Sequence, residues 1–225
     1  MMKKSLTARF LSLILALIQS VSLCVPAFAA GGFSDVPASH WAYNDIMTCA
    51  EAGIVKGYED GSFRPGEEVT AIQFIVMLTR AFYSDKVKAV EVPAGSKWYY
   101  ANAKVASDVG VSKNLAAVDK NAMNRYNMAM VLRNTMIDFN KQPTSDQMRN
   151  AQSQIKGWSD IAAAYTTYTA AVSSCCAAGI LPCMPDGTFS GVQNVTRAQA
   201  CAVIVRMMNF IGDSALTTPE QSTQP

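Results

Sequence analysis

The sequence predicts an all-α fold built from three tandem helix-turn-helix repeats. Two observations lead to this prediction. Segments of the chain recur at fixed offsets, and each copy places helix start and stop signals around apolar residues with helical spacing. Half of the 225 residues are hydrophobic and 16% are charged, which is the composition of a folded protein. No pair of helices can bury its apolar face alone, so the three copies are expected to pack on each other.

Residues 1–30 are predicted to be a signal peptide. Lys3 and Lys4 precede an apolar run from Phe10 to Val25, and the small-residue stretch Ala27–Ala30 follows it. This order is typical of a secretory leader. The alternative is a retained membrane anchor, but polar residues interrupt the run and it is short for a span of ~20 residues. We therefore expect a secreted protein with no membrane association after cleavage.

The strongest repeat has an offset of 126 residues. It aligns residues 50–54 with 176–180, and the turn Asp60-Gly61-Ser62-Phe63 with residues 186–189. A weaker copy lies between, at an offset of 57, where Trp98 aligns with Trp41. This copy lacks the Asp-Gly-Ser-Phe turn. The expected repeats span residues 31–90, 91–150 (degenerate) and 151–212, residues 138–157 are expected to be a polar linker, and residues 213–225 a disordered polar tail.

Each copy carries helix boundary signals. The first helix is expected to begin near residues 39–41 with Ser39 as its N-cap, and to end at Gly53 in the left-handed conformation. The second helix is expected to begin at Thr70, whose spacing to Gln73 predicts a capping box. The matching stops in the other copies are Gly110 and Gly179, and the matching starts are Asn124 and Thr196.

Charge and composition exclude several classes of function. The leader holds three of the 19 basic residues and no acid, which leaves 16 basic against 17 acidic residues. Such a chain has no basic field for nucleic acid. With the single histidine His40, the HExxH motif and His-rich metal sites are excluded, and neither a phosphate loop nor a GxGxxG motif is present. No cofactor, no metal site and no enzymatic activity are expected.

Five cysteines follow the leader. Cys49 and Cys201 fall in apolar helical runs and are expected to be buried small hydrophobes. Cys175 and Cys176 are adjacent, and Cys183 follows in a turn. Two interpretations are open for these three: a bridge from Cys183 to one of the other two, or free thiols throughout.

Two of the copies closely resemble the S-layer homology repeat. The resemblance is carried by Phe33-Ser34-Asp35-Val36, Trp41-Ala42 and residues 53–65 (GIVKGYEDGSFRP) in the first copy, and by Val195-Thr196-Arg197-Ala198-Gln199 in the third, where Gln replaces the family's Glu. It extends from Gly31 to about Gly212. It implies a pseudo-threefold helical unit with grooves between repeats, and binding to secondary cell-wall polymers, which are often pyruvylated. It also implies a location in the cell wall or S-layer.

The resemblance and the residue chemistry together predict glycan-binding residues. An arginine just after a helix cap lies at the positive end of the helix dipole beside free backbone N–H groups, and its planar fork suits a carboxylate. Tryptophan offers a flat face to a sugar ring, and aspartate accepts from hydroxyl groups. The predicted residues are Asp35, Trp41, Lys56, Trp98, Arg125, Asp160 and Arg197.

Other roles for these residues are open. The two tryptophans would also serve as core anchors, and the two aspartates as helix caps or turn formers. No copy holds the complete set, because Ala71 replaces the expected arginine in the first copy, Val92 the aspartate in the second and Thr167 the tryptophan in the third. Lys56 is a flexible substitute for the missing arginine.

Two functions follow from these patterns. The first is non-covalent binding to a secondary cell-wall polymer, a peptidoglycan-linked anionic glycan with or without pyruvyl groups, as an anchor or S-layer-associated structural protein. The alternative is a helical protein–protein interaction or self-association module of the envelope that binds no glycan.

Overall fold

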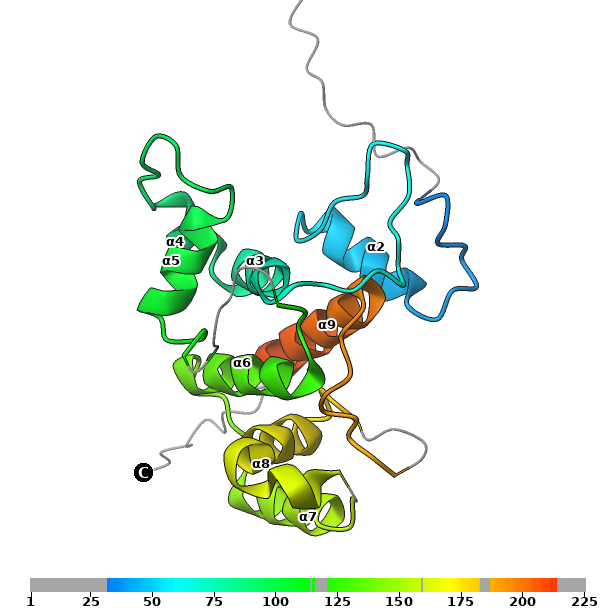
Figure 1. Cartoon of the computed structure of the whole chain (residues 1–225), viewed down its shortest axis with the longest axis vertical. Coiled ribbons are helices and arrows are strands. Elements are labelled where there is room, and N and C mark those ends of the chain that lie inside the picture. Colours follow the sequence, from blue (N-terminus) through cyan, green and yellow to red (C-terminus); the bar gives the residue numbers. More distant parts are fainter. Residues whose placement is uncertain (1–31, 114, 116–120, 159, 183–186, 214–225) are drawn as a thin grey trace, which may run out of the picture. The chain divides into compact units, whose positions relative to one another are not determined.

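The computed structural model describes residues 32–113, 115, 121–158, 160–182 and 187–213. The predicted signal peptide, Cys183 and the predicted tail beyond residue 213 lie outside these residues. The described part contains eight α-helices and no strand, which confirms the all-α prediction (Figure 1). The helices are α2 (Tyr43–Glu51), α3 (Ala71–Phe82), α4 (Ser84–Lys88), α5 (Tyr100–Asp108), α6 (Arg125–Asp138), α7 (Ser145–Ile155), α8 (Ile161–Ala177) and α9 (Arg197–Asp213).

The three repeats meet in a closed ring of backbone hydrogen bonds. Val69 N–H donates to Val195 O (2.9 Å), Val195 N–H donates to Met123 O (2.8 Å), and Met123 N–H donates to Val69 O (2.8 Å). Each of these residues lies just before α9, α6 or α3, and all three side chains are buried. Because each segment donates to one neighbour and accepts from the other, the repeats are arranged around a pseudo-threefold axis. Below, repeats 1, 2 and 3 denote residues 31–90, 91–150 and 151–212.

Helix packing follows the same cyclic order. In each repeat, the first helix packs on the second helix of the preceding repeat: α2 on α9, α5 on α3, and α8 on α6. The core therefore lies between repeats and no repeat has one of its own, as the apolar pattern predicted. None of the helices in the described residues has both the length and the apolar character needed to cross a membrane.

The predicted caps of the second helices are confirmed. Thr70 Oγ1 accepts from Gln73 N–H (3.3 Å), and Gln73 Oε1 accepts from Thr70 N–H (2.8 Å). Thr196 and Gln199 form the same box, at 3.3 and 3.0 Å. Asn124 caps α6 by accepting from the N–H of residue 127 at 2.8 Å. These starts depend only on local hydrogen bonds, which explains why the sequence revealed them.

The predicted helix stops are confirmed as well. Gly53, Gly110 and Gly179 have φ values of 70°, 76° and 67°. After α2, Ile54 N–H donates to Cys49 O (2.8 Å), which is the six-to-one bond of a Schellman motif. A β-branched residue at these positions would strain the backbone.

Two boundary predictions are wrong. The first helix begins at Tyr43, after Ala42, so Ser39 is not its cap. The chain makes tight turns through His40, whose Nδ1 accepts from Ala42 N–H (3.1 Å), and no side chain caps α2.

Residues 138–157 also differ from the expected linker, because they include helix α7. Thr144 and Gln147 form a third capping box there, and Ala151 and Ile155 are the buried positions of the helix. Only these two side chains anchor it, so its apolar face is too narrow for periodicity to reveal.

Candidate functional site

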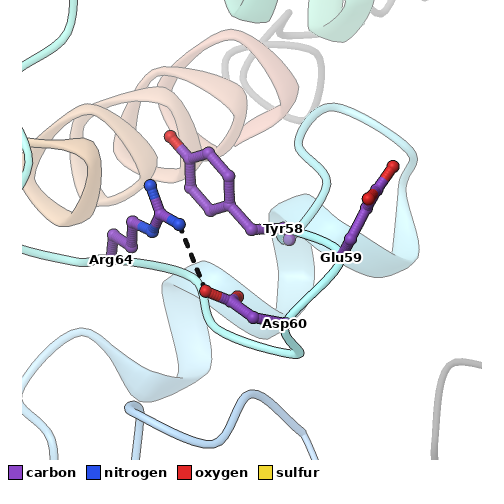
Figure 2. Close-up of a pocket in the computed structure, with 5 residues that line it drawn as sticks. Tyr58, Glu59, Asp60 and Arg64 are labelled. Carbon is purple, nitrogen blue, oxygen red and sulfur yellow. Dashed lines mark hydrogen bonds and ion pairs between the residues drawn. The ribbon is translucent and has the colours of Figure 1, made fainter.

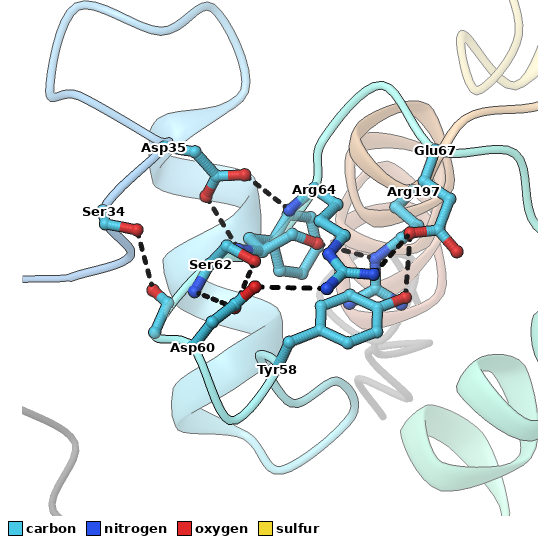
Figure 3. Close-up of polar contacts among 10 residues, drawn as sticks. Ser34, Asp35, Tyr58, Asp60, Ser62, Arg64, Glu67 and Arg197 are labelled. Atoms are coloured by element: carbon cyan, nitrogen blue, oxygen red, sulfur yellow. Dashed lines mark hydrogen bonds and ion pairs between the residues drawn. The ribbon is translucent and has the colours of Figure 1, made fainter.

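In the loop between α2 and α3, side chains from other segments hold both the N–H and the carbonyl of Phe63. Asp35 Oδ1 accepts from Phe63 N–H and Oδ2 accepts from Arg64 N–H, both at 2.7 Å (Figure 3). Arg64 has a φ of 59°, and the carboxylate holds the backbone in this unusual conformation. Asp35 therefore acts as a turn former, one of the two open roles, while its predicted glycan contact is not tested.

Asp160 makes the same pair of contacts in repeat 3. Its Oδ1 accepts from Phe189 N–H (3.0 Å), and its Oδ2 accepts from Ser190 N–H (2.7 Å), where φ is 54°. Phe63 and Phe189 are both fully buried. The two aspartates thus hold a buried phenylalanine under a turn of the same geometry.

Arg197 fixes the opposite side of Phe63. Its Nε donates to Phe63 O (2.8 Å) and its Nη2 donates to Lys56 O (3.0 Å), while the guanidinium lies 4.4 Å from the Phe63 ring centroid. Arg197 begins α9 of repeat 3, so it clamps the loop of repeat 1. Lys56 contributes its backbone carbonyl to this clamp, and the residue itself is exposed.

Arg125 repeats this clamp one boundary further on. Its Nε donates to Phe189 O (2.8 Å) and its Nη2 donates to Pro182 O (3.0 Å), with the guanidinium 4.7 Å from the Phe189 ring. Arg125 is only 8% exposed, and this burial lowers the pKa of its guanidinium. At the third boundary the equivalent residue is Ala71, which has no side chain to form a clamp.

The predicted helix-end anion site is wrong in one respect, because the backbone N–H groups there are not free. The first-turn N–H groups of α9 donate to Glu67 O (2.8 Å), Pro65 O (3.1 Å) and Thr196 Oγ1 (3.3 Å). Those of α6 donate to the equivalent acceptors, Gln193 O, Gly191 O and Asn124 Oδ1. The neighbouring repeat's loop takes the place of an anion, an arrangement that no single repeat's sequence reveals.

A charged cluster surrounds the repeat 1 clamp, and sequence reasoning did not select it. Tyr58 Oη donates to Glu67 Oε2 (3.0 Å), and the Arg64 guanidinium stacks 3.8 Å from the Tyr58 ring centroid (Figure 3). Burial and the hydrogen bond to Glu67 raise the pKa of Tyr58. Arg64 also pairs with Asp60 at 3.1 Å. The only signal in the sequence was that Tyr58, Asp60 and Arg64 lie within the segment GYEDGSFRP; Glu67 follows it by two residues.

A pocket of about 500 Å³ lies on this cluster. It is lined by Gly57, Tyr58, Glu59, Asp60 and Arg64 (Figure 2). The side chain and backbone of Ser62 donate hydrogen bonds to Asp60, and Arg64 donates a third. Together they lower the pKa of Asp60 to about 2, with the Ser62 bonds contributing most. The pocket therefore presents a carboxylate, a guanidinium and an aromatic ring together.

The two predicted tryptophans lie at the surface, so the core-anchor alternative is wrong. Trp41 is 63% exposed and stacks beside His40, and Trp98 is 66% exposed and forms a T-shaped ring contact with Tyr99. The structure thus groups Asp35, Lys56 and Arg197 at one loop and Asp160 and Arg125 at the other. Among the described residues, no hydrogen bond or ring contact links either tryptophan to these loops.

Comparison with protein families identifies two matching segments. Residues 32–75 and 156–201 match the S-layer homology domain. The chain contains S-layer homology repeats. The matched segments fall in repeats 1 and 3, in which Asp35 and Asp160 each accept from two backbone N–H groups of a turn. The boundaries of the repeats stay predictions, as does the assignment of residues 91–150 to the same family. That assignment is based on the cyclic packing and the shared caps.

Several relatives carry similar segments. Outer membrane protein SlpA of Thermus thermophilus is 36% identical over 72 residues, which is 32% of this chain and 8% of SlpA. S-layer protein sap of Bacillus anthracis is 43% identical over 56 residues, 24% of this chain and 7% of that protein. An endoglucanase of Bacillus sp. strain KSM-635 is 25% identical over 212 residues, 88% of this chain and 22% of the endoglucanase. The chain thus spans less than a tenth of SlpA and of sap. The family match and these relatives support the expected cell-surface location.

Proposed function

We propose that this S-layer homology protein attaches non-covalently to a secondary cell-wall polymer at the cell surface. One observation carries the proposal: Trp41 and Trp98, at equivalent positions of repeats 1 and 2, are both about two-thirds exposed. A buried indole stabilises a fold substantially, whereas an exposed indole contributes little to folding stability. Two exposed indoles at equivalent positions therefore favour a role in binding. A flat ring held at the surface suits the apolar face of a sugar.

The clamps support this proposal by making the loops rigid. Arg197 is partly exposed, and its Nε and Nη2 hold carbonyls of repeat 1. Its Nη1 donates to no acceptor within the described residues, and its guanidinium lies 5.1 Å from the Tyr58 ring. We assign an anionic group of the polymer to this remaining edge of Arg197. Arg125 is buried, and we assign it a positioning role.

Binding, rather than catalysis, is the proposed activity. The likeness to the endoglucanase covers 22% of that protein, and no activity is transferred from it. The proposed partner is an anionic glycan linked to peptidoglycan, in which a carboxylate such as a pyruvyl group would match the guanidinium fork.

Cosedimentation with purified cell-wall polysaccharide tests the proposal. We expect Trp41→Ala and Trp98→Ala each to weaken binding about 10-fold, on the order of 1.4 kcal/mol, with unchanged melting temperature because both rings are exposed. Val192→Ala is the matched control, since Val192 is 81% exposed and is not assigned to the site. Unchanged sedimentation of the folded double tryptophan variant would contradict the glycan-binding proposal.

The same experiment separates the alternative of a protein–protein module. Polysaccharide prepared with and without its pyruvyl groups, and free of protein, is offered to the same variants. Binding that depends on the pyruvyl groups and on Trp41 favours the glycan. If the natural chain does not bind the protein-free polysaccharide at all, the interaction module is favoured.

A further inference from the structure

Cys49 and Cys201 face each other across the boundary between repeats 1 and 3. Cys49 lies on α2 and Cys201 on α9, and both residues are fully buried. The Cys49 thiol donates to the backbone carbonyl of Cys201, with Sγ 3.8 Å from the oxygen. Both are free thiols in the structure. Two buried cysteines that lie far apart in the sequence are thus neighbours in the fold.

The repeat arrangement supplies a comparison for this pair. Cys175 on α8 is the equivalent of Cys49, and Ala129 on α6 is the equivalent of Cys201. The Cys175 Sγ is 3.5 Å from Ala129 O, which is the same contact as between Cys49 and Cys201. The first-helix sulfur therefore meets the same backbone position at both boundaries. Only at the boundary between repeats 1 and 3 does that position itself carry a thiol.

We propose that Cys49 and Cys201 form a disulfide bond that joins repeat 1 to repeat 3. A small-molecule or protein disulfide supplies the oxidising equivalents. The thiolate of one cysteine attacks the donor disulfide, forms a mixed disulfide and releases one donor thiol. The second cysteine then attacks the bound protein sulfur and releases the other donor thiol. Two protein thiols are thus oxidised by two electrons, and one donor disulfide is reduced to two thiols.

The bond is expected to form while the chain folds. In the folded protein, the neighbouring Cys49 thiol and burial raise the pKa of Cys201, which disfavours the reactive thiolate. Once formed, the bond is shielded from reductants by the same burial. It would close a loop of ~150 residues, for which chain entropy predicts a large stabilisation. Cys201 lies one helical turn after Arg197, so the bond would also fix the clamp of repeat 1.

Refolding of the full chain with oxidised glutathione or with excess reductant tests this proposal. Free thiols are then labelled in denaturant, and the linked peptides are identified by mass spectrometry. We expect a Cys49–Cys201 peptide in the oxidised sample alone, with a melting temperature about 10 °C above that of the reduced sample. Cys49→Ala should fold, because Ala106 is the equivalent residue of repeat 2, and should lose both the peptide and the difference in melting temperature.

Cys175→Ala is the matched control. It removes a cysteine of equal burial whose partner position is alanine, so the linked peptide and the difference in melting temperature should both persist. Ala129→Cys should create a second linkage, to Cys175. Labelling of both Cys49 and Cys201 after oxidative refolding would overturn the proposal. A linkage of Cys49 to another cysteine, or an equal redox response in Cys49→Ala, would overturn it as well.

Discussion

The loops of repeats 1 and 3 use the same backbone device in different surroundings. In both, an aspartate holds the N–H of a buried phenylalanine and an arginine from another repeat holds its carbonyl. Around Phe63, the arginine is partly exposed and neighbours the polar cluster of Tyr58, Arg64 and Glu67. Around Phe189, the arginine is buried and two rings, those of Tyr126 and Trp158, pack on the phenylalanine. The Phe63 ring packs on that of Phe33, with centroids 5.1 Å apart.

The additional ring of Tyr126, which α6 of repeat 2 places on Phe189, explains this difference. The Phe189 ring centroid lies 5.6 Å from that of Tyr126 and 6.2 Å from that of Trp158. Tyr126 stacks in turn on Tyr168 at 4.5 Å. At the equivalent of Arg64, repeat 3 has Ser190, so it also lacks the stacked guanidinium. One clamp thus seals a core, and the other leaves a charged edge open to a ligand.

The strongest test of this contrast removes the buried clamp. Arg125→Ala leaves the carbonyls of Phe189 and Pro182 without their donors and opens a cavity beneath the ring, so we expect a loss of about 3 kcal/mol in the free energy of unfolding. Chemical denaturation followed by circular dichroism measures it. A loss no larger than that of Arg197→Ala would show that the two clamps are energetically alike.

A second test targets the close approach at Gly191. A Cβ at this position would overlap the Tyr126 ring. Gly191→Ala must therefore displace a ring that packs on Phe189, and we expect it to cost about 2 kcal/mol of stability. Gly66→Ala is the control from repeat 1, because a Cβ there meets no atom within 4 Å. Equal melting temperatures for the two variants would show that the Tyr126 ring moves aside at little cost.

Local signals explain which parts of the fold the sequence predicted. The capping boxes at Thr70 and Thr196 and the stops at Gly53, Gly110 and Gly179 depend on residues within a few positions, so their patterns are readable in one copy. Helix α7 was missed because only two of its side chains are buried, and the start of α2 because no side chain caps this helix.

The roles of the site residues depended on contacts between repeats. Position alone suggested that Arg125 and Arg197 were equivalent ligands, yet the aromatic residues of repeat 3 bury one of them. The helix N-terminus was expected to offer free N–H groups, but a loop of another repeat occupies them. Such long-range contacts leave no periodic pattern, whereas the predicted surface role of Trp41 and Trp98 agrees with their exposure.

The exposed clamp should be less important for stability than for binding. Arg197 is partly exposed and one of its two acceptors is the carbonyl of the exposed Lys56, so we expect Arg197→Ala to cost only about 1 kcal/mol in the free energy of unfolding. We expect polymer binding to fall about 10-fold or more, because the proposed charged contact is lost. Arg197→Lys should restore only part of the binding, since the planar fork is missing. A variant that binds normally would place the ligand elsewhere.

The smallest expected effect concerns the charge pair that repeat 1 has and repeat 3 lacks. Hydrogen bonds from Ser62, then that of Arg64, lower the pKa of Asp60 from 3.8 to about 2. Because the folded-state pKa is depressed, the Asp60 carboxylate contributes its stabilisation above the unfolded-state pKa and loses it as the pH falls toward 2. Asp60→Asn should therefore be slightly less stable than the natural chain near neutral pH, and the difference should vanish near pH 2.

Thermal midpoints measured between about pH 6 and pH 2, at low and high salt, check this expectation. The effect is small because Asp60 and Arg64 are both about half exposed, so that solvent and salt screen their pairing. Asp85→Asn is the control, since Asp85 pairs with Lys88 at 3.4 Å on an almost fully exposed side chain. A difference between Asp60→Asn and the natural chain that grows as the pH falls would have the wrong sign. The turn of repeat 1 would then owe its shape to Asp35 alone, as the turn of repeat 3 owes its shape to Asp160.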